Sequence, residues 1–409
     1  MHILVINGGS SSIKFSIFEA GQERGSKLPN PCVIYDGEIS GMGAELRFTL
    51  RDAEGRELGE GPGQDYSSTD PLELLERAVC KAGMPVLEAV GYRVVHPGAL
   101  INRHQQITPG VLKDLEEAAV FAPLHDPQAV GLIRNMMGRF PRARHYACFD
   151  TVFHQTMPVE ASTYAIPADY RRRGVRRYGF HGLSCESVVA DLRSAVERGQ
   201  GKFPRRLVIA HLGSGCSVTA LVDGQSLENS MGLTPTGGVV MGTRPGDLDP
   251  GLVLYLLRTQ QGDVKAASTA LETILNHQSG MVALSGLPND MRGVRKAAEA
   301  GNPDARLATA IFTRTIRKAI GGYAWVMGGL DAIVFTGGIG EHDVLSRAEI
   351  LSGLENYGVM LDTAANQAGG DDLRKISSKD SQVAVWVVTA QEDRMIAVHV
   401  RQMESNKEE

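Results

Sequence analysis

The sequence predicts an α/β fold built from two related lobes. Its 409 residues are more than one ordinary hydrophobic core organises, so we expect two units. In the second half, apolar strand-like runs alternate with helical segments, which is typical of a parallel or mixed sheet covered on both faces. A strand, a Gly/Ser turn and a second strand open the chain and recur near its middle as VIAHLGSGCSVTALVDG. Repetition at half-chain spacing indicates lobes of similar topology.

The first hairpin is expected from strands at residues 3–6 and 13–18 around a polar turn at 7–12. A shift of 205 positions places Gly8 on Gly213 and Ser12 on Ser217 in the mid-chain hairpin. Further extended segments are expected at 32–40 and 45–50, with a polar, glycine-rich stretch at 53–68.

Helices are expected where aspartate precedes proline, at Asp70-Pro71 and Asp126-Pro127. An aspartate N-cap accepts from a free backbone N–H group, and proline is tolerated at the first helical position. In the second half we expect helices at 249–261, 264–277 and 305–327, a last buried strand at 382–389, and a final helix.

Charge and composition exclude several classes of function. The formal charge of −5 comes from 42 basic and 47 acidic side chains mixed along the sequence, so we expect no nucleic-acid partner. The N-terminus carries no basic leader and its apolar run is short, which predicts neither a signal peptide nor a membrane anchor. The five cysteines lie far apart without a CxxC pair and are expected as reduced thiols. We therefore expect a cytoplasmic protein.

Glycine-rich turns after apolar strands predict phosphate binding. They read NGGSSS after Ile6, HLGSGCS after Ile209 and TGGIGE after Phe335. Glycines and hydroxyls expose several backbone N–H groups together, as a multiply charged phosphate requires. None matches GxxxxGK[ST] or the GxGxxG of a strand-to-helix turn, so P-loop and Rossmann folds are disfavoured. One such turn is more often structural, but three in one chain favour a nucleotide.

Asn7 and Lys14 flank the first of these turns. A side-chain amide can meet a metal-bound water, and an ammonium group can meet a phosphate. The alternative is a capped turn beside an exposed strand lysine.

Further polar runs follow in the order YRVVHPG, FAPLHDP, FDTVFHQTMP, RYGFHGLS, SMGLTPTGGVVMGTRPGDLDP and NDMRG. In this order they resemble the acetate kinase (acetokinase) family of the actin, heat-shock ATPase and sugar kinase superfamily. The resemblance extends from Asn7 to about Ala397, and RYGFHG with MGTRPGDLDP is a restrictive pair of motifs. It implies duplicated actin-like, ribonuclease H-like domains with a nucleotide cleft between them. One would comprise residues 1–152 with the C-terminal helix 390–409, and the other residues 153–389, which bind the nucleotide.

The resemblance implies reversible, direct in-line transfer of a phosphoryl group from ATP to acetate, with Mg²⁺ or in its place Mn²⁺, by a homodimer. It places Asn7 and Glu392 at the metal. It places at the transferring phosphoryl Arg93, Asp150, His181 and Arg244. Around ATP or ADP it places Lys14, His211, Leu212, Gly213, Ser214, Gly215, Asp290, Met291, Arg292, Gly338, Ile339, Gly340, Glu341 and His342. An acid pocket would consist of Arg93, Val95, Leu124, Phe180 and Pro235.

Phosphoryl transfer needs positioning and neutralisation of charge more than covalent chemistry. The guanidinium forks of Arg93 and Arg244 match a carboxylate or a phosphoryl group. For Arg244 the alternative is a structural bridge to Asp247 or Asp249. His181 could donate a hydrogen bond to the same oxygens, or be an ordinary core histidine.

Two carboxylates receive different roles. An acetate acceptor, with a pKa of roughly 4 to 5, is already ionised at neutral pH and has no proton to lose. Asp150 is therefore assigned to orienting an arginine or a magnesium water, with base catalysis as the weaker hypothesis. Glu392 supplies a hard oxygen for magnesium and is assigned by counting back from the last Ile-Ala of TAQEDRMIA. Gln391 or Asp393 is the alternative neighbour of the metal.

Two departures from the family pattern affect the nucleotide loops. Ser214 stands where asparagine is customary, and His342 stands where GIGEN ends in asparagine, which leaves nucleotide preference open. The nearest rival function is a propionate or butyrate kinase of the same fold, because one or two methylenes change binding by only about 1–3 kcal/mol. A rival of another class is a non-catalytic, nucleotide-dependent switch.

Overall fold

The computed structural model describes residues 1–8, 12–21, 30–41, 46–58, 70–81, 83–118, 126–370 and 372–406. The chain divides into two compact units. Unit 1 comprises Met1–Val152 and Gln391–Glu409, and unit 2 comprises Phe153–Ala390.

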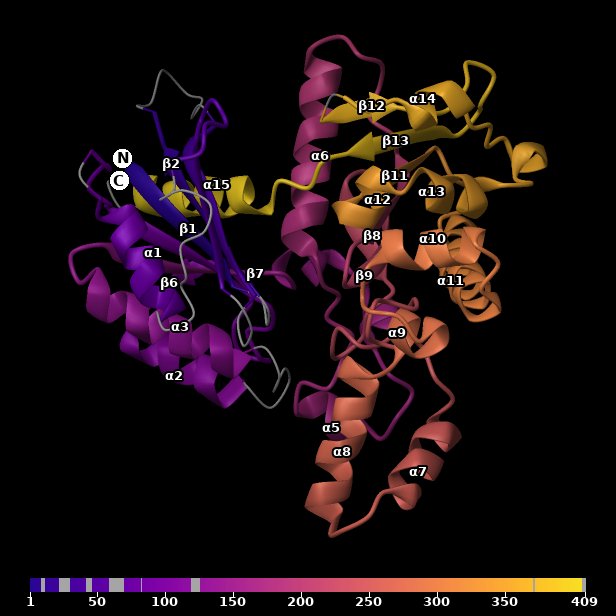
Figure 1. The fold of residues 1–409 in the computed structure, drawn as a ribbon, viewed down its shortest axis with the longest axis horizontal. Coiled ribbons are helices and arrows are strands. Elements are labelled where there is room, and N and C mark those ends of the chain that lie inside the picture. The colour runs from indigo at the N-terminus through magenta and orange to yellow at the C-terminus, as the bar shows by residue number, and fades with distance from the viewer. Residues whose placement is uncertain are drawn as a thin grey trace. The chain divides into compact units, whose positions relative to one another are not determined.

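Unit 1 is a mixed sheet with helices, drawn in indigo, magenta and, for its last helix, yellow (Figure 1). Its strands are β1 (His2–Gly8), β2 (Ser12–Glu19), β3 (Cys32–Ser40), β4 (Arg47–Asp52), β5 (Ala89–Val94), β6 (Gln105–Gln106) and β7 (Arg144–Phe149). Its helices are α1 (Pro71–Val79), α2 (Pro109–Ala118), α3 (Asp126–Arg139) and α15 (Glu392–Ser405). The strand order is β4-β3-β2-β1-β5-β7-β6, with β1, β5 and β7 parallel.

The centre of the unit 1 sheet is buried on both faces, which explains the unbroken apolar run of β1. Leu4 and Ile6 belong to the same core cluster as Leu74 of α1 and Ile133 of α3. Gly91 of β5, which pairs with Val5 of β1, faces α15. A Cβ there would lie 2.6 Å from Ile396 and 2.9 Å from Val400. Glycine therefore lets α15 lie close to β5.

Unit 2 contains a second mixed sheet. Its strands are β8 (Arg206–Leu212), β9 (Cys216–Val222), β10 (Gln225–Asn229), β11 (Ala332–Thr336), β12 (Leu373–Lys375) and β13 (Ala384–Val388). Its helices are α4 (Val159–Ser162), α5 (Ala168–Arg172), α6 (Gly182–Glu197), α7 (Pro250–Thr259), α8 (Val264–His277), α9 (Gly280–Ser285), α10 (Met291–Glu299), α11 (Pro303–Val326), α12 (Gly337–His342), α13 (Val344–Leu351) and α14 (Thr363–Gln367). Single 3₁₀ turns lie at Val152–Thr156, where the units meet in the chain, and at Glu355–Tyr357.

The unit 2 sheet repeats the topology of unit 1, as the hairpin match predicts. Its order is β10-β9-β8-β11-β13-β12, with β8 antiparallel to β9 and parallel to β11. In unit 1, β1 likewise pairs antiparallel with β2 and parallel with β5. The first hairpin closes at the pair Gly8–Ile13 and the second at Leu212–Cys216, so the match at 205 positions does not hold residue by residue.

Most expected elements form, with small shifts at their ends. Asp70 caps α1 by accepting from Leu72 N–H at 3.1 Å, and Asp249 caps α7 in the same way. The third glycine-rich turn was misread, because TGGIGE contains the start of helix α12. Gly337 begins that helix with a φ of 75°, a value that favours glycine.

α11 is the longest helix described, with 24 residues. Among the helices of the described ranges, none combines the length and the apolar character needed to cross a membrane.

Candidate functional site

Five of the predicted site residues of unit 1 lie at or beside one edge of its sheet. Asn7 lies near the end of β1, Arg93 near the end of β5, and Asp150 directly after β7. These strands are parallel neighbours, so their carboxyl ends meet at the same edge. Glu392 opens α15, which packs on β1 and β5. Lys14 of β2 is the hairpin partner of Asn7.

Arg93 is the centre of this cluster. Its Nε lies 3.0 and 3.2 Å from the two oxygens of Asp150, and its Nη2 lies 2.6 Å from Oδ2. Its Nη1 donates to Asn7 Oδ1 at 3.2 Å and lies 3.2 Å from Glu392 Oε2. Burial alone would lower the pKa of Arg93, but the carboxylates of Asp150 and Glu392 outweigh it and raise the pKa above its ordinary value. The guanidinium is therefore charged and fixed in direction.

Asp393 follows Glu392 on α15 and supports Asn7. Asn7 Nδ2 donates to Glu392 Oε2 at 3.2 Å and to Asp393 Oδ1 at 3.3 Å. Ser16 Oγ donates to the other oxygen of Asp393 at 2.9 Å. Burial raises the pKa of Asp393, against the hydrogen bond from Ser16, and the charge of Glu392 raises it further. Of the two carboxylates, Glu392 is the one that faces Arg93.

In unit 2, His181 and His211 stack with ring centroids 4.1 Å apart. His181 precedes α6 with a φ of 57°, a left-handed conformation that is costly for a residue with a Cβ. Its Nδ1 lies 2.9 Å from Ser217 Oγ on β9. The Nδ1 of His211 lies 2.8 Å from Ser184 Oγ on α6. The hydrogen bonds to β9 and α6, together with the strained backbone of His181, fix the two imidazole rings.

The turn between β8 and β9 brings His181 and Arg244 to a glycine backbone. A Cβ on Gly215 would lie 3.4 Å from His181 Nε2 and 3.8 Å from Arg244 Nη1. Gly213 N–H donates to Gly215 O at 3.0 Å, which closes the turn. Arg244 Nη1 donates to Pro235 O at 3.1 Å, and burial lowers the pKa of Arg244. The absent side chain of Gly215 thus leaves space beside an imidazole and a guanidinium.

The structural alternative for Arg244 was a bridge to Asp247 or Asp249. Asp247 Oδ1 accepts from Gly238 N–H at 2.8 Å. Asp249 Oδ1 accepts from Gly251 N–H at 2.9 Å as the cap of α7. Both carboxylates therefore serve the local backbone.

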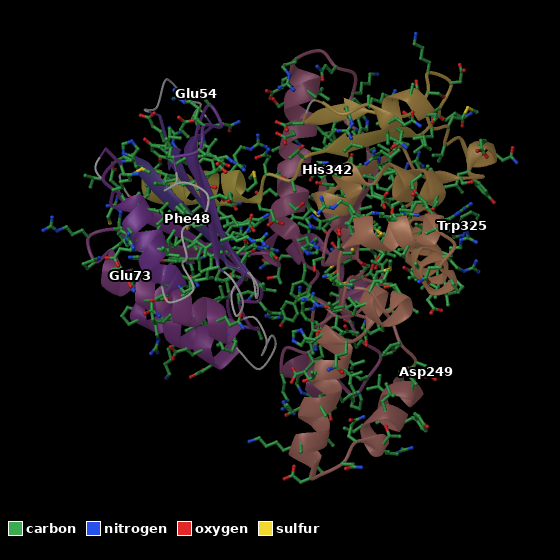
Figure 2. All side chains as sticks on the ribbon, viewed as in Figure 1. Phe48, Glu54, Glu73, Asp249, Trp325 and His342 are labelled. Carbon is green, nitrogen blue, oxygen red and sulfur yellow. The ribbon has the colours of Figure 1, made fainter. Side chains whose placement is uncertain are left out.

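A cavity of about 620 Å³ lies in unit 2 beside this turn, a volume in the range of small-molecule sites. It is formed by the β8–β9 turn, α10 and α12, with His342 of α12 labelled in Figure 2. The predicted nucleotide residues in its wall are Gly213, Ser214, Asp290, Met291, Arg292, Gly338, Ile339 and His342. Of the other predicted nucleotide residues, His211, Leu212 and Gly215 belong to the adjoining hairpin, and Lys14 belongs to unit 1.

Ser214 connects two walls of this cavity. Its Oγ accepts from Asn289 Nδ2 at 2.9 Å, and its carbonyl accepts from Gly242 N–H at 3.0 Å. The departure from asparagine at this position is therefore accommodated by a side-chain partner from the segment before α10.

Sequence reasoning missed several residues of the cavity wall, namely Asn289, Arg295, Lys296, Glu299, Asp343 and Leu345. Arg295 is the most connected, with Nη1 at 2.6 Å from Glu349 Oε1 and Nε at 3.1 Å from Asp343 Oδ2. A signal was present, because Arg295 and Glu299 follow Met291 at four-residue intervals and so share one face of α10.

Gly340 and Glu341 do not line the cavity, but they belong to helix α12, which does. Glu341 Oε1 accepts from Gly337 N–H at 2.9 Å and from Ala390 N–H at 3.0 Å. The fully buried Arg347 donates to Gly340 O at 2.8 Å and to Glu341 O at 2.9 Å. Burial lowers the pKa of Arg347 to about 10. These bonds hold the short helix α12 in place.

Of the predicted acid-pocket residues, Phe180 and Pro235 lie in unit 2 and Val95 in unit 1, while Leu124 lies outside the described residues. Phe180 is buried, and its backbone is held by Asn229, which accepts from Phe180 N–H at 3.4 Å and donates to its carbonyl at 3.2 Å.

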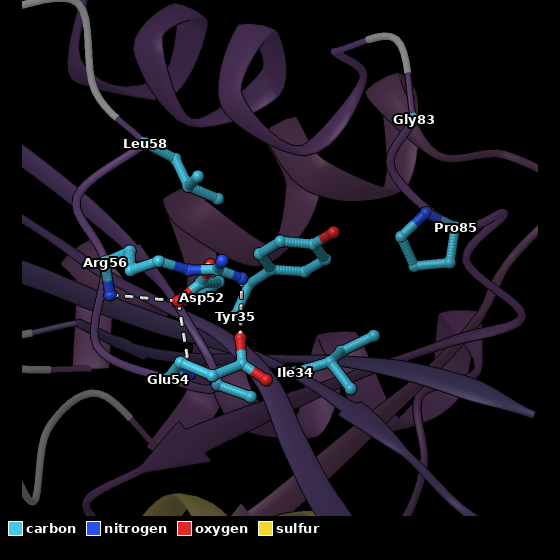
Figure 3. A pocket seen from close by; sticks show the side chains of 9 residues that line it. Ile34, Tyr35, Asp52, Glu54, Arg56, Leu58, Gly83 and Pro85 are labelled. Atoms are coloured by element: carbon cyan, nitrogen blue, oxygen red, sulfur yellow. Dashed lines mark hydrogen bonds and ion pairs between the residues drawn. The ribbon is translucent and has the colours of Figure 1, made fainter.

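A second cavity, of about 470 Å³, lies in unit 1 and contains none of the predicted site residues (Figure 3). Arg56 extends into it, but its Nε lies 2.7 Å from Asp52 Oδ2 and its Nη2 lies 2.9 Å from Glu54 Oε2. Because its charged groups are paired with one another, we assign this cavity no role in the reaction.

A cavity of nucleotide size beside a glycine turn, in a chain that repeats one actin-like topology, is the arrangement of a nucleotide-dependent phosphotransferase. The sequence profile of the acetokinase family matches residues 2–398. An acetate kinase of Clostridium botulinum is 36% identical over 405 residues, which cover 97% of this chain and 98% of the relative. The chain belongs to the acetokinase family.

Solved structures agree with this relationship. An acetate kinase from Porphyromonas gingivalis matches with a TM-score of 0.80 at 31% identity, covering 98% of this chain and 99% of that chain. A propionate kinase from Francisella tularensis matches with a TM-score of 0.82 at 35% identity, covering 97% and 98%. The predicted family, the duplicated α/β fold and the class of enzyme, an ATP-using phosphotransferase with a carboxyl acceptor, are confirmed. The roles of individual residues stay predictions.

Proposed function

We propose that the chain transfers the γ-phosphoryl group of ATP to acetate, reversibly, to give acetyl phosphate and ADP. The observation that carries this proposal is the approach of His181 and Arg244 to the backbone of Gly215, beside the cavity of unit 2. Hydrogen-bond donors aimed at one small space suit an oxyanion whose charge grows in the transition state.

Arg244 and His181 act on the migrating phosphoryl group. A loose, in-line transition state spreads charge over three equatorial oxygens, which a guanidinium can bind in pairs. We assign the hydroxyl of Ser217 as the donor to Nδ1 of His181, and in that tautomer Nε2 carries the proton and donates to the same group. The bond from Arg244 to Pro235 O fixes the direction of the guanidinium.

Arg93 binds the acceptor carboxylate, and Asp150 orients Arg93. The bidentate contact between them leaves the guanidinium one fixed direction. Because acetate enters as an anion, the reaction requires no general base, and Asp150 remains an ionised partner throughout.

Mg²⁺ fits the oxygen groups of unit 1, and Mn²⁺ would substitute for it. Asn7 Oδ1 and Glu392 Oε2 each lie 3.2 Å from Nη1 of Arg93, so these two hard oxygens, of the kind that Mg²⁺ prefers, are close neighbours. Asn7 and Glu392 would hold the ion and its waters, with Asp393 fixing the amide of Asn7. When bound, the ion neutralises phosphate charge; Lys14 binds phosphate beside it.

The adenosine of ATP occupies the cavity of unit 2. Its wall includes the apolar side chains of Met291, Ile339 and Leu345, which can pack against a base. The phosphates lie toward the β8–β9 turn, where His211, Leu212 and Gly215 follow one another on the hairpin.

Propionate is the second candidate acceptor, favoured by the similarity to the propionate kinase of Francisella tularensis. The two acids differ by one methylene, so the residues predicted for the acid pocket, rather than the chemistry, would decide the ratio between them.

The experiment measures ADP formation by the purified protein with Mg-ATP and, separately, formate, acetate, propionate and butyrate. We expect the highest kcat/KM with acetate, with each added methylene lowering it by roughly 10-fold or more. A higher kcat/KM with propionate would move the assignment to propionate kinase.

The protein is proposed to work as a cytosolic homodimer. None of its five cysteines forms a disulfide, as expected in a reducing compartment. The apolar helix α7 has no buried residue, and its Leu254 and Tyr255 are 51% and 62% exposed. Trp325, at the outer end of α11, is 88% exposed (Figure 2). Exposed apolar surface of this kind suits an interface with a second copy.

A further inference from the structure

Tyr164 lies between α4 and α5, outside the motifs that carry the predicted site. Its hydroxyl accepts a hydrogen bond from Leu233 N–H at 2.8 Å. Leu233 belongs to the irregular segment 230–236 between β10 and α7, whose backbone is outside the sheet. We call residues 230–236 the acid loop, because they include Pro235 of the predicted acid pocket.

The phenol packs directly against the backbone of the acid loop. A Cβ on Gly232 would collide with the hydroxyl oxygen of Tyr164, whereas the ring carbon Cζ would lie 3.5 Å from it. The hydroxyl thus requires glycine at position 232, and glycine lets the hydroxyl reach Leu233.

The ring of Tyr164 also has a contact with Arg177. The guanidinium carbon of Arg177 lies 5.1 Å from the ring centroid, a cation–π contact. Arg177 N–H also donates to Ser162 O at 2.8 Å, which ties the end of α4 to the segment that leads to Phe180. Tyr164 is therefore itself well positioned.

The acid loop connects Tyr164 with Arg244. Tyr178 N–H donates to Gly232 O at 3.0 Å, so the loop is fixed to the segment of Phe180. Two residues after Leu233, the carbonyl of Pro235 accepts from Arg244 Nη1 at 3.1 Å. A shift of the loop at Leu233 would thus move both the pocket proline and the acceptor that directs the guanidinium.

We propose that Tyr164 is a positioning residue for the acid acceptor: its hydroxyl fixes the acid loop and thereby sets the KM for the acid and the preference among acids. The proposal rests on the proposed function and deepens it. Among the described residues, the nucleotide cavity shares no wall with the acid loop, so Tyr164 has little influence on the binding of adenosine.

The first test replaces Tyr164 with phenylalanine. Tyr164→Phe removes one hydrogen bond, and we expect the KM for acetate to rise roughly 3- to 10-fold, with the KM for Mg-ATP within about 2-fold of its original value. The ratio of kcat/KM for acetate over propionate falls as the loop loosens. Tyr170→Phe is the matched control, because Tyr170 has a similar contact with Arg173 but is exposed on α5.

The second test is a double-mutant cycle with Gly232→Ala. In the original protein the added methyl group meets the hydroxyl of Tyr164, so we expect a rise in the KM for acetate larger than that of Tyr164→Phe. In the Tyr164→Phe background the same methyl group meets only Cζ at 3.5 Å, and it should add little. This coupling would not arise from two independent losses of stability.

Equal changes in the KM values for acetate and Mg-ATP, or additive effects of the two substitutions, would overturn the role of Tyr164. Absence of acid-dependent ADP formation in the unsubstituted protein would instead overturn the proposed function. Melting temperatures of all variants separate a positioning effect from partial unfolding, since a Tyr164→Phe protein that melts normally must owe its altered KM to the site.

Discussion

Arg93 and Asp150 are joined by N–O contacts of 2.6–3.2 Å, and Asp150 is almost fully buried. Such a pair defines the direction of the guanidinium, and without the Asp150 carboxylate Arg93 would be drawn toward Glu392, 3.2 Å from its Nη1. Removing one member of a buried pair is costly because the other charge stays behind.

Asp150→Asn should therefore lower kcat about 100-fold or more. Without the Asp150 carboxylate the Arg93 guanidinium would turn away, and the acceptor carboxylate that it binds would be misplaced. The remaining rate should keep the pH dependence of the original enzyme between about pH 6 and 8, since no proton is removed from acetate. Steady-state kinetics across that range provide the measurement. A residual rate that climbs steadily with pH would show that hydroxide replaces a lost general base, and would contradict the positioning role.

His154 makes unit 2 sensitive to acid. It is fully buried, with Nδ1 2.8 Å from Ser226 Oγ and Nε2 2.8 Å from Phe180 O, and burial lowers its pKa to about 4. Because the folded pKa lies below the unfolded value of roughly 6.5, the folded state binds fewer protons between these values. Stability from this histidine is present above pH 6.5 and is lost as the pH falls toward 4.

Acidification from about pH 7 to pH 5 should thus cost about 2 kcal/mol of unfolding free energy at His154. In His154→Gln the melting temperature should be lower at neutral pH, but its decrease on acidification should be smaller. Calorimetry at both pH values measures this, with the exposed His277→Gln as control. An unchanged pH slope in His154→Gln would contradict the assignment.

Among the elements, α12 is the least predictable from sequence. Six residues that include three glycines have little tendency to form a helix. Four hydrogen bonds from the buried Arg347 stabilise it, two to α12 carbonyls and two to Asn366. A tertiary contact therefore decides this element, and the strand-turn signal TGGIGE could not reveal it.

Arg347→Met should loosen α12 and raise the KM for Mg-ATP by roughly 10-fold, because α12 forms one wall of the cavity. The KM for acetate should change much less. Kinetics with each substrate varied in turn make the measurement, and Arg306→Met, at an exposed position on α11, is the control. Equal effects on both KM values would indicate general unfolding rather than a loosened nucleotide wall.

Other elements were predictable because their signals are local. The caps at Asp70 and Asp249 lie within a few residues of the N–H groups they serve, and the strand of each hairpin is a short apolar run. The close approach of α15 to β5 depends on a contact between residues 91 and 396, which are far apart in the sequence, so no local pattern indicates it. The candidate site shows the same division: its glycine-rich turns were visible in the sequence, whereas the Arg295 network and Tyr164 depend on packing.

At the scale of the whole molecule, duplication of one topology explains why the site residues of each unit lie at corresponding strand ends. Asn7 and the HLGSG segment both lie at the end of the first strand of a sheet, and Arg93 and Gly337 both lie at the end of its parallel neighbour. The half-chain repeat predicted that the two units correspond, whereas the family motifs predicted the chemistry of the site.

The proposed homodimer predicts twice the chain mass of 44.0 kDa in solution. A charge placed on the exposed face of α7, as in Tyr255→Glu, should shift the protein toward monomer by more than about 10-fold in dissociation constant, because a charge is buried without a partner. Sedimentation equilibrium measures the mass. Val86→Glu, at an apolar residue of unit 1 that is even more exposed than Tyr255, should leave the dimer intact. A monomeric original protein, or equal effects of both substitutions, would contradict an interface at α7.

The most direct test of the central claim is chemical trapping of the product. Purified protein is incubated with Mg-ATP, acetate and hydroxylamine, and acetohydroxamate is compared with ADP. We expect equal amounts of both, dependent on acetate and reduced at least about 100-fold in Arg244→Ala, because the proposed role of that guanidinium is to neutralise the migrating phosphoryl group. ADP without hydroxamate, or no turnover with any short acid despite nucleotide binding, would contradict a carboxylate kinase and favour a nucleotide-dependent switch.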